Sequence, residues 1–140
     1  MTTLPNRTRL RQLQDLLVSG QFVRLYGNPH LPSSGDTGGE YTEVLAPGYG
    51  AQALRFEDWR ITEAGAEGAE VGFLFLQPPF PLVYGYFLTE RVTGRFLWGD
   101  AFVDTAGRLA PLTPTTPNFE LYVVPRLRLA PLVDLANTER

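Results

Sequence analysis

The sequence predicts a mainly β protein, an antiparallel β-sandwich of jelly-roll-like form with one short N-terminal helix. Short segments of β-type composition follow one another along the chain, with turn signals at intervals of about 8–12 residues. Twelve prolines and fourteen glycines supply these turns. Only one segment, 6–19, has the spacing of an amphipathic helix.

The helix predicted over 6–19 has leucines three and four residues apart, which places them on one face. They are Leu10, Leu13, Leu16 and Leu17. Asn6 suits the N-cap and Gly20 the C-terminal stop. Three arginines in the first turns oppose the helix dipole; they are Arg7, Arg9 and Arg11. The helix either closes one end of the β-domain or docks on a neighbouring subunit, and the arginines favour docking.

Strands are predicted at 21–26, 41–45, 51–61, 71–76, 82–88, 96–103 and 119–129. The strand at 96–103 is expected to bulge near Gly99, and the last strand to break at Pro125. Residues 30–40, 64–69 and 104–107 are expected to be loops or turns. Eight aromatic side chains are expected to be mostly buried: Trp59, Phe73, Phe75, Tyr84, Phe87, Phe96, Trp98 and Tyr122.

An uncharged, apolar run at 71–89 is long enough to cross a bilayer. Pro78, Pro79 and Pro81 lie in its middle, so we expect two buried strands joined by a proline turn instead. The expected organisation is a helical arm over 1–20, a β-domain over 21–129 and a C-terminal tail over 130–140.

The composition excludes many kinds of site. The chain has no cysteine and one histidine, His30, which excludes thiol chemistry, disulfides, iron–sulfur clusters and two-histidine metal sites. It has no lysine, which excludes Schiff-base and P-loop chemistry. A net charge of −3 argues against binding to nucleic acid. The N-terminus lacks the apolar stretch of a secretory signal, so we expect a soluble protein made in the cytoplasm.

Two groups of polar residues fall in or next to the loop after the first predicted strand. His30 lies close to Ser33 and Ser34, but a Pro/Gly loop implies no ordered nucleophile and base. Three carboxylates near glycines are candidate calcium ligands, although their spacing matches no defined calcium loop. They are Asp36, Glu40 and Glu43. We expect neither an active site nor a metal site in this loop.

Two carboxylate pairs are candidates for glycoside cleavage. Glu57 and Asp58 are neighbours in sequence, and neighbours in a strand point to opposite faces. Asp100 and Asp104 flank a strand end and a turn, where aspartate is common. The chain is therefore expected to have no catalytic residues and no cofactor, and not to be an enzyme.

Seven short motifs occur in a recognisable order. They are Leu25-Tyr26-Gly27-Asn28, Tyr41-Thr42-Glu43, Gly48-Tyr49-Gly50, Trp59, Val83-Tyr84-Gly85-Tyr86-Phe87, Phe96-Leu97-Trp98-Gly99-Asp100-Ala101-Phe102 and Pro125-Arg126-Leu127-Arg128-Leu129. Together with the leucine-rich helix, this series covers most of residues 7–129. It resembles a loose group of small virion structural proteins of tailed bacteriophages.

The resemblance implies a β-sandwich on the virion. The expected role is that of a capsid cement or decoration protein on the outer surface of the head. Such a protein would bridge subunits of the major capsid protein, associate with itself as a trimer, and bind neither nucleic acid nor membrane.

The alternative is a tail, baseplate or fibre-associated protein with a glycan-binding face. A cluster of aromatic residues suggests it, because exposed aromatics mark interfaces and carbohydrate sites; the cluster comprises Phe80, Tyr84, Tyr86, Trp98 and Phe102. Nine residues are predicted for a partner interface: Arg7, Leu10, Arg11, Leu13, Leu17, Phe80, Tyr86, Arg126 and Arg128.

Overall fold

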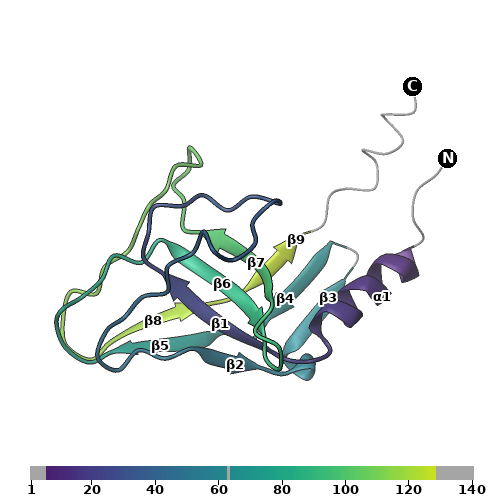
Figure 1. Ribbon diagram of the computed structural model, residues 1–140, viewed down its shortest axis with the longest axis horizontal. Coiled ribbons are helices and arrows are strands. Elements are labelled where there is room, and N and C mark those ends of the chain that lie inside the picture. Colours follow the sequence, from purple (N-terminus) through teal and green to yellow (C-terminus); the bar gives the residue numbers. More distant parts are fainter. Residues whose placement is uncertain (1–5, 63, 129–140) are drawn as a thin grey trace.

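The computed structural model describes residues 6–62 and 64–128, and within them the protein is mainly β with one N-terminal helix (Figure 1). The helix is α1 (Asn6–Leu17). The strands are β1 (Gln21–Tyr26), β2 (Gln52–Leu54), β3 (Trp59–Thr62), β4 (Gly65–Gly68), β5 (Val71–Phe75), β6 (Gly85–Glu90), β7 (Phe96–Ala101), β8 (Phe119–Val123) and β9 (Arg126–Arg128). The predicted tail over 130–140 lies outside the described residues.

The described strands form three sheets, and all of their pairings are antiparallel. The orders are β2-β1-β6-β7, β3-β4-β9 and β5-β8. The predicted fold class, mainly β and antiparallel with one short helix, is therefore confirmed. These sheets are not the two four-stranded sheets of a jelly roll, so that finer expectation is not confirmed.

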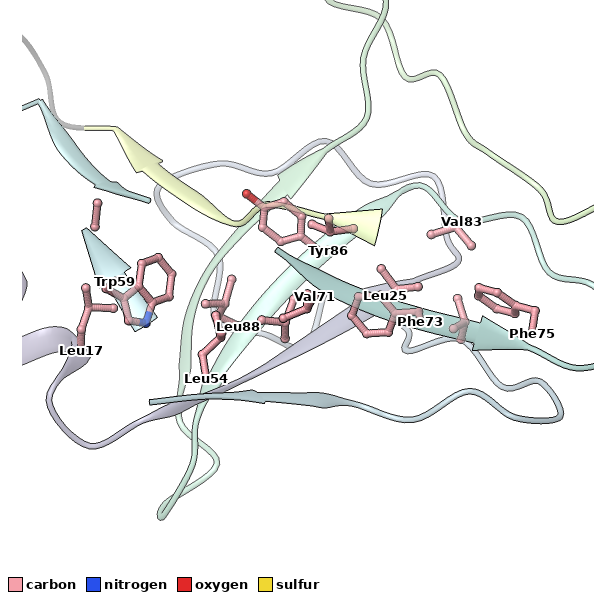
Figure 2. Packing of buried hydrophobic residues seen from close by; sticks show 14 residues of the cluster. Leu17, Leu25, Leu54, Trp59, Val71, Phe73, Phe75, Val83, Tyr86 and Leu88 are labelled. Carbon is pink, nitrogen blue, oxygen red and sulfur yellow. The ribbon is translucent and has the colours of Figure 1, made fainter. Parts of the chain in front are cut away.

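The main core lies on one face of the β1-β6 pair and is closed by β5, β8 and the β3-β4 hairpin. Side chains alternate between the two faces of a strand, so Val23 and Leu25 of β1 both point into this core, as do Phe73 and Phe75 of β5. Figure 2 shows Phe73 and Phe75 at one end of this cluster and Trp59 and Leu17 at the other, with Val71 and Leu88 between them.

A second cluster covers the opposite face of β1, β6 and β7. Tyr26 and Phe87 point to this face, and Tyr41, from the long loop after β1, packs between them. The Tyr41 ring stacks on Phe87 and Phe96 with centroids 5.1 Å from each, and meets Tyr26 edge-on at 4.9 Å. The central sheet is thus buried on both faces, and the loop at 28–43 is its second cover.

The α1 helix packs on its own β-domain. Leu13 and Leu17 are 3% and 0% exposed. The side-chain amide of Gln21 donates to the carbonyl oxygen of Leu17 at 2.7 Å, and Trp59 Nε1 donates to Gln21 Oε1 at 2.7 Å. Gly20 ends the helix with a φ of +79°, as predicted. The preference for docking on a neighbour is therefore wrong for the described leucines, because this chain buries them itself.

Two predicted boundaries are wrong. The strand expected over 51–61 is interrupted by a 3-10 turn at Phe56–Asp58, in which the Asp58 carboxylate accepts from the Arg55 N–H at 2.8 Å. This turn moves the chain from β2 into a different sheet. The loop expected at 64–69 is strand β4, which pairs with both β3 and β9. Its glycine-rich composition disguised a strand that only tertiary pairing specifies.

Three smaller expectations also differ. Residues 41–45 form only an isolated bridge, between Glu43 and Tyr26. The irregularity expected near Gly99 is present in β7, but it falls at Leu97, where the register with β6 shifts. Tyr122 is 55% exposed because alternation along β8 turns it outward, where its ring covers Gly72.

The proline segment 78–81 does join β5 to β6, but these two strands do not pair with each other, because β5 pairs with β8.

Candidate functional site

Asp36 organises the loop that covers the central sheet. Its side chain is 5% exposed and accepts hydrogen bonds from His30 Nε2 at 2.9 Å and from the Tyr41 hydroxyl at 2.6 Å. The Ser33 N–H and hydroxyl also donate to it, at 3.0 and 3.2 Å. Ser33 therefore bonds to the carboxylate and not to His30, which is not the chain of contacts that activates a serine. The arrangement ties the loop onto Tyr41 and the sheet.

The hydrogen bonds around Asp36 stabilise its ionised form. Burial opposes ionisation, but the bonds from Tyr41, His30 and Ser33 outweigh it and hold the pKa of Asp36 well below its ordinary value. The pKa of Tyr41 is raised, first by burial and then by its bond to the negative carboxylate. In the unfolded chain Asp36 titrates near its ordinary pKa of about 3.9.

We expect Asp36 to make folding sensitive to acid. Because its pKa is lowered in the folded state, its contribution is complete above a pH of about 4 and is lost as the pH falls below that value. Asp36→Asn should cost about 1.5–3 kcal/mol at pH 7, and should lose less stability than the wild type between about pH 5 and 2.5. Urea unfolding of the wild type and of the variant at about pH 5 and about pH 2.5 measures this difference in acid sensitivity. Equal losses in the two proteins would contradict the assignment.

The other candidate calcium ligands point elsewhere. The Glu40 carboxylate accepts from the Thr37 and Gly38 N–H groups at 3.0 and 2.9 Å. The Glu43 carboxylate accepts from the Tyr49 hydroxyl at 2.6 Å and pairs with Arg24 at 3.1 Å. Among the residues that the structure describes, no group of carboxylates and histidine is placed to hold a metal ion.

Within each of the two candidate carboxylate pairs, the two side chains make different contacts. Asp58 caps the 3-10 turn while Glu57 faces solvent. Asp104 accepts from the Ala106 and Arg108 N–H groups within a turn. Asp100 lies within β7, where its carboxylate accepts from the Tyr86 hydroxyl at 3.4 Å. Asp58 and Asp104 thus cap turns and Asp100 bonds to a tyrosine, and neither pair has the shared geometry of an acid and a base.

A groove of about 540 Å³ runs along the outer edge of β7. The loop residues 32–36 form one wall and β9 forms the other. The β9 wall is held by side chains, since the Arg126 N–H donates to the Tyr86 hydroxyl and Trp98 Nε1 donates to the Arg126 carbonyl, both at 2.9 Å. The Arg126 guanidinium pairs with Glu67 at 2.8 Å. Arg128 also lines this groove.

A second surface feature is an end of the molecule that has no charged residue. We name it the uncharged pole; it comprises residues 45–50, 76–84 and 111–118. Each of these segments is part of a longer stretch of sequence without a charged residue, namely 44–54, 71–89 and 109–119. Backbone hydrogen bonds join its loops: the Leu76 N–H to the Pro47 carbonyl at 2.9 Å, and the Asn118 N–H to the Leu76 carbonyl at 3.0 Å. Four of its leucines are 42–88% exposed: Leu45, Leu76, Leu82 and Leu112.

The uncharged pole lies far from α1. Figure 1 shows the loops after β5 and before β8 at one end of the molecule and α1 at the other. Seven of the twelve prolines belong to the pole and restrict its loops. They are Pro47, Pro78, Pro79, Pro81, Pro111, Pro114 and Pro117.

The nine predicted interface residues divide into groups. Leu13, Leu17 and Tyr86 are buried in this chain, which corrects their assignment to a partner surface. Phe80, half-buried, belongs to the pole, and Arg126 borders the groove. Arg11 is exposed on α1, and Arg128 is exposed on β9. The side chains of Arg7 and Leu10 lie outside the described part. The exposed leucines of the pole and the edge of β7 were not among the residues predicted from the sequence.

The aromatic cluster is not an exposed face. Tyr86 is buried, and Phe80, Tyr84, Trp98 and Phe102 are half-buried. The clearest exposed aromatic ring among the described residues is Tyr122, whose hydroxyl donates to Glu120. The surplus of aromatic residues is therefore mostly core, and it does not support a glycan-binding face.

The chain matches no protein-family model, no curated protein and no solved structure. No helix within residues 6–62 and 64–128 combines the length and hydropathy required to span a bilayer.

Proposed function

We propose that this chain is a non-enzymatic structural protein of a bacteriophage virion, of the capsid cement or decoration type. It acts on the outer surface of the head, bridges subunits of the major capsid protein and associates as a trimer. The uncharged pole is the observation that carries the proposal, together with the motif order described above.

The pole has the composition of the centre of a protein interface. Interface centres are depleted in charged residues and rich in apolar ones, whereas a surface exposed to water is normally charged. Leu45 is 88% exposed and its neighbours carry no charge. The prolines fix the loops before contact, so less conformational entropy is lost when a partner covers them.

The opposite end of the molecule has different chemistry. Helix α1 presents Arg11 there, and its first turns also contain Arg7 and Arg9. An apolar contact at one end and a charged contact at the other suit a protein that joins two neighbours. Many copies on a lattice would turn modest contacts into strong attachment.

Charge placed on the pole should abolish attachment to heads. Leu45→Glu is expected to weaken co-sedimentation with undecorated heads of the encoding phage at least about tenfold, because a carboxylate would have to be desolvated. Val92→Glu is the matched control, since Val92 is 81% exposed in the turn between β6 and β7. Thermal unfolding should be unchanged for both variants.

The copy number in purified virions separates head from tail. Hundreds of copies by quantitative mass spectrometry would agree with a cement protein. About a dozen copies or fewer would favour a tail or baseplate protein, and absence from virions would overturn the proposal. Equal head binding by Leu45→Glu and Val92→Glu would remove the pole from the contact.

A further inference from the structure

The outer face of the β5-β8 sheet presents a tyrosine ring that is fixed in place. Tyr122 is 55% exposed and lies opposite Gly72 in the register of the two strands. A Cβ added at Gly72 would lie 3.0 Å from this ring, so one side of the ring rests on the glycine and the other side is open to solvent. The Tyr122 hydroxyl donates to Glu120, whose side chain lies on the same face of β8. The ring is therefore ordered before any partner arrives.

The charges around this ring are negative. Glu70 and Glu120 are exposed, and among the ion pairs of the described residues none involves either of them. The hydrogen bond to Glu120, and then the negative charges of Glu120 and Glu70, raise the pKa of Tyr122. The 3-10 turn at Phe56–Asp58 is hydrogen-bonded to the residue before Glu70, and its two carboxylates outweigh Arg55 beside them. This face therefore favours a positively charged partner.

A guanidinium group suits this face better than an ammonium group. The planar guanidinium of an arginine stacks on an aromatic ring and at the same time donates to a carboxylate beside the ring. Tyr122 and Glu120 provide that ring and that carboxylate side by side. Leu74, half-buried opposite Glu120, adds an apolar contact. The partner is therefore expected to present arginine.

Helix α1 of this same chain has the matching chemistry. It carries arginine at positions 7, 9 and 11, and the side chain of Arg11 is exposed. These positive charges oppose the helix dipole, so the stability of the helix does not account for them. Leu13 and Leu17 hold the helix on its own domain, and Arg11 lies outside that buried contact.

We propose that α1 of one copy docks on the outer face of the β5-β8 sheet of a second copy, with Arg11 on Tyr122 and Glu120. Figure 1 shows α1 at one end of the molecule and this sheet toward the other, so the two surfaces meet only between copies. A contact between two different surfaces is head-to-tail, and it closes into a ring when its rotation allows. The inference rests on the self-association proposed above and names the surfaces that form the trimer.

Exchanging the two charges tests this contact in the purified full-length chain. Arg11→Glu and Glu120→Arg should each weaken self-association at least about tenfold in sedimentation velocity, because each brings like charges together. The double variant should recover most of the wild-type association. Arg108→Glu makes the same charge change on a side chain that is 80% exposed elsewhere, and should associate normally. Thermal unfolding checks that all four variants are folded.

A double variant no stronger than the single variants would overturn the inference, as would single variants that associate like the wild type. If those variants still form trimers, only the docking surfaces named here are wrong. A wild type that stays monomeric would overturn both this contact and the proposed trimer. The effect of Leu45→Glu on head binding is measured separately, so attachment through the pole is not decided by these results.

Crosslinking provides a second test, since the chain has no native cysteine. Gln14→Cys places a thiol on the exposed side of α1, and Leu74→Cys places one beside Glu120, with Arg11 left in place. A chain with both substitutions, treated with a short bis-maleimide, should give covalent trimers, and a mixture of the two single variants should give heterodimers. Dimers of Gln14→Cys alone, or no crosslinking in any sample, would contradict a head-to-tail contact.

Discussion

Deleting residues 1–19 should unfold the β-domain. The deletion removes Leu13 and Leu17, both buried against the strands, and truncating a buried leucine typically costs about 2–5 kcal/mol. It also removes the carbonyl acceptor of Gln21, whose amide holds the Trp59 indole. The combined loss of about 5 kcal/mol or more rivals the whole stability of an ordinary domain. A helix that docked its leucines on a neighbouring subunit, as its arginines favour from sequence alone, would instead leave the β-domain folded after the deletion.

Far-ultraviolet circular dichroism and urea unfolding of the truncated chain measure this effect. Leu17→Ala provides a milder test, with an expected loss of about 2–5 kcal/mol. Gln14→Ala is its control on the exposed side of the same helix, and should change stability by less than about 0.5 kcal/mol. A truncated chain with wild-type β signal and cooperative unfolding would show that α1 is dispensable to the fold.

Phe75→Ala should destabilise the protein by about 3–5 kcal/mol. Phe75 is 0% exposed and lies in the main core with Phe73, where the Tyr49 ring stacks on both, at 6.1 and 5.8 Å between centroids. Removing it leaves a cavity between the loop at 45–50 and β5. The Tyr49 hydroxyl still bonds to Glu43, so the loop cannot simply collapse into the space.

Tyr122→Ala is the matched control for Phe75→Ala. It also removes an aromatic ring from the β5-β8 sheet, but from the face that is exposed to solvent. Its expected loss is about 1 kcal/mol or less. Chemical unfolding midpoints with unchanged slopes would report both losses. A Phe75→Ala loss as small as that of Tyr122→Ala would mean that the sheet packing is misassigned.

Strands with strong local patterns could be predicted from the sequence. Alternating apolar residues at 21–26 and 71–75 match β1 and β5, and Pro125 does separate β8 from β9. Strand β4 could not be predicted in this way. Gly65 and Gly68 have low strand propensity, and what makes the segment a strand is the pairing of its two edges with β3 and β9.

The candidate surfaces were only partly visible in the sequence. The sequence shows that 44–54, 71–89 and 109–119 contain no charged residue. It does not show that parts of these three segments lie together at one end of the molecule, because that depends on long-range contacts. His30, Ser33 and Asp36 lie close in sequence, whereas the role of Tyr41 follows from the fold of the loop. The free edge of β7 could not be predicted, because it depends on which strand lies beside it.

The pairing pattern has a consequence for how the chain reaches its native state. Each sheet is closed by residues more than 40 positions apart in sequence, as in Gln21 with Glu90, Gly65 with Arg128 and Phe75 with Phe119. Folding with such distant contacts is slow, because much chain entropy is lost before the contacts form. Until then the apolar segment 71–89 is exposed on a nascent or refolding chain. Soluble yield should therefore rise when expression is slowed or a chaperone is supplied, and dilute refolding should outperform concentrated refolding.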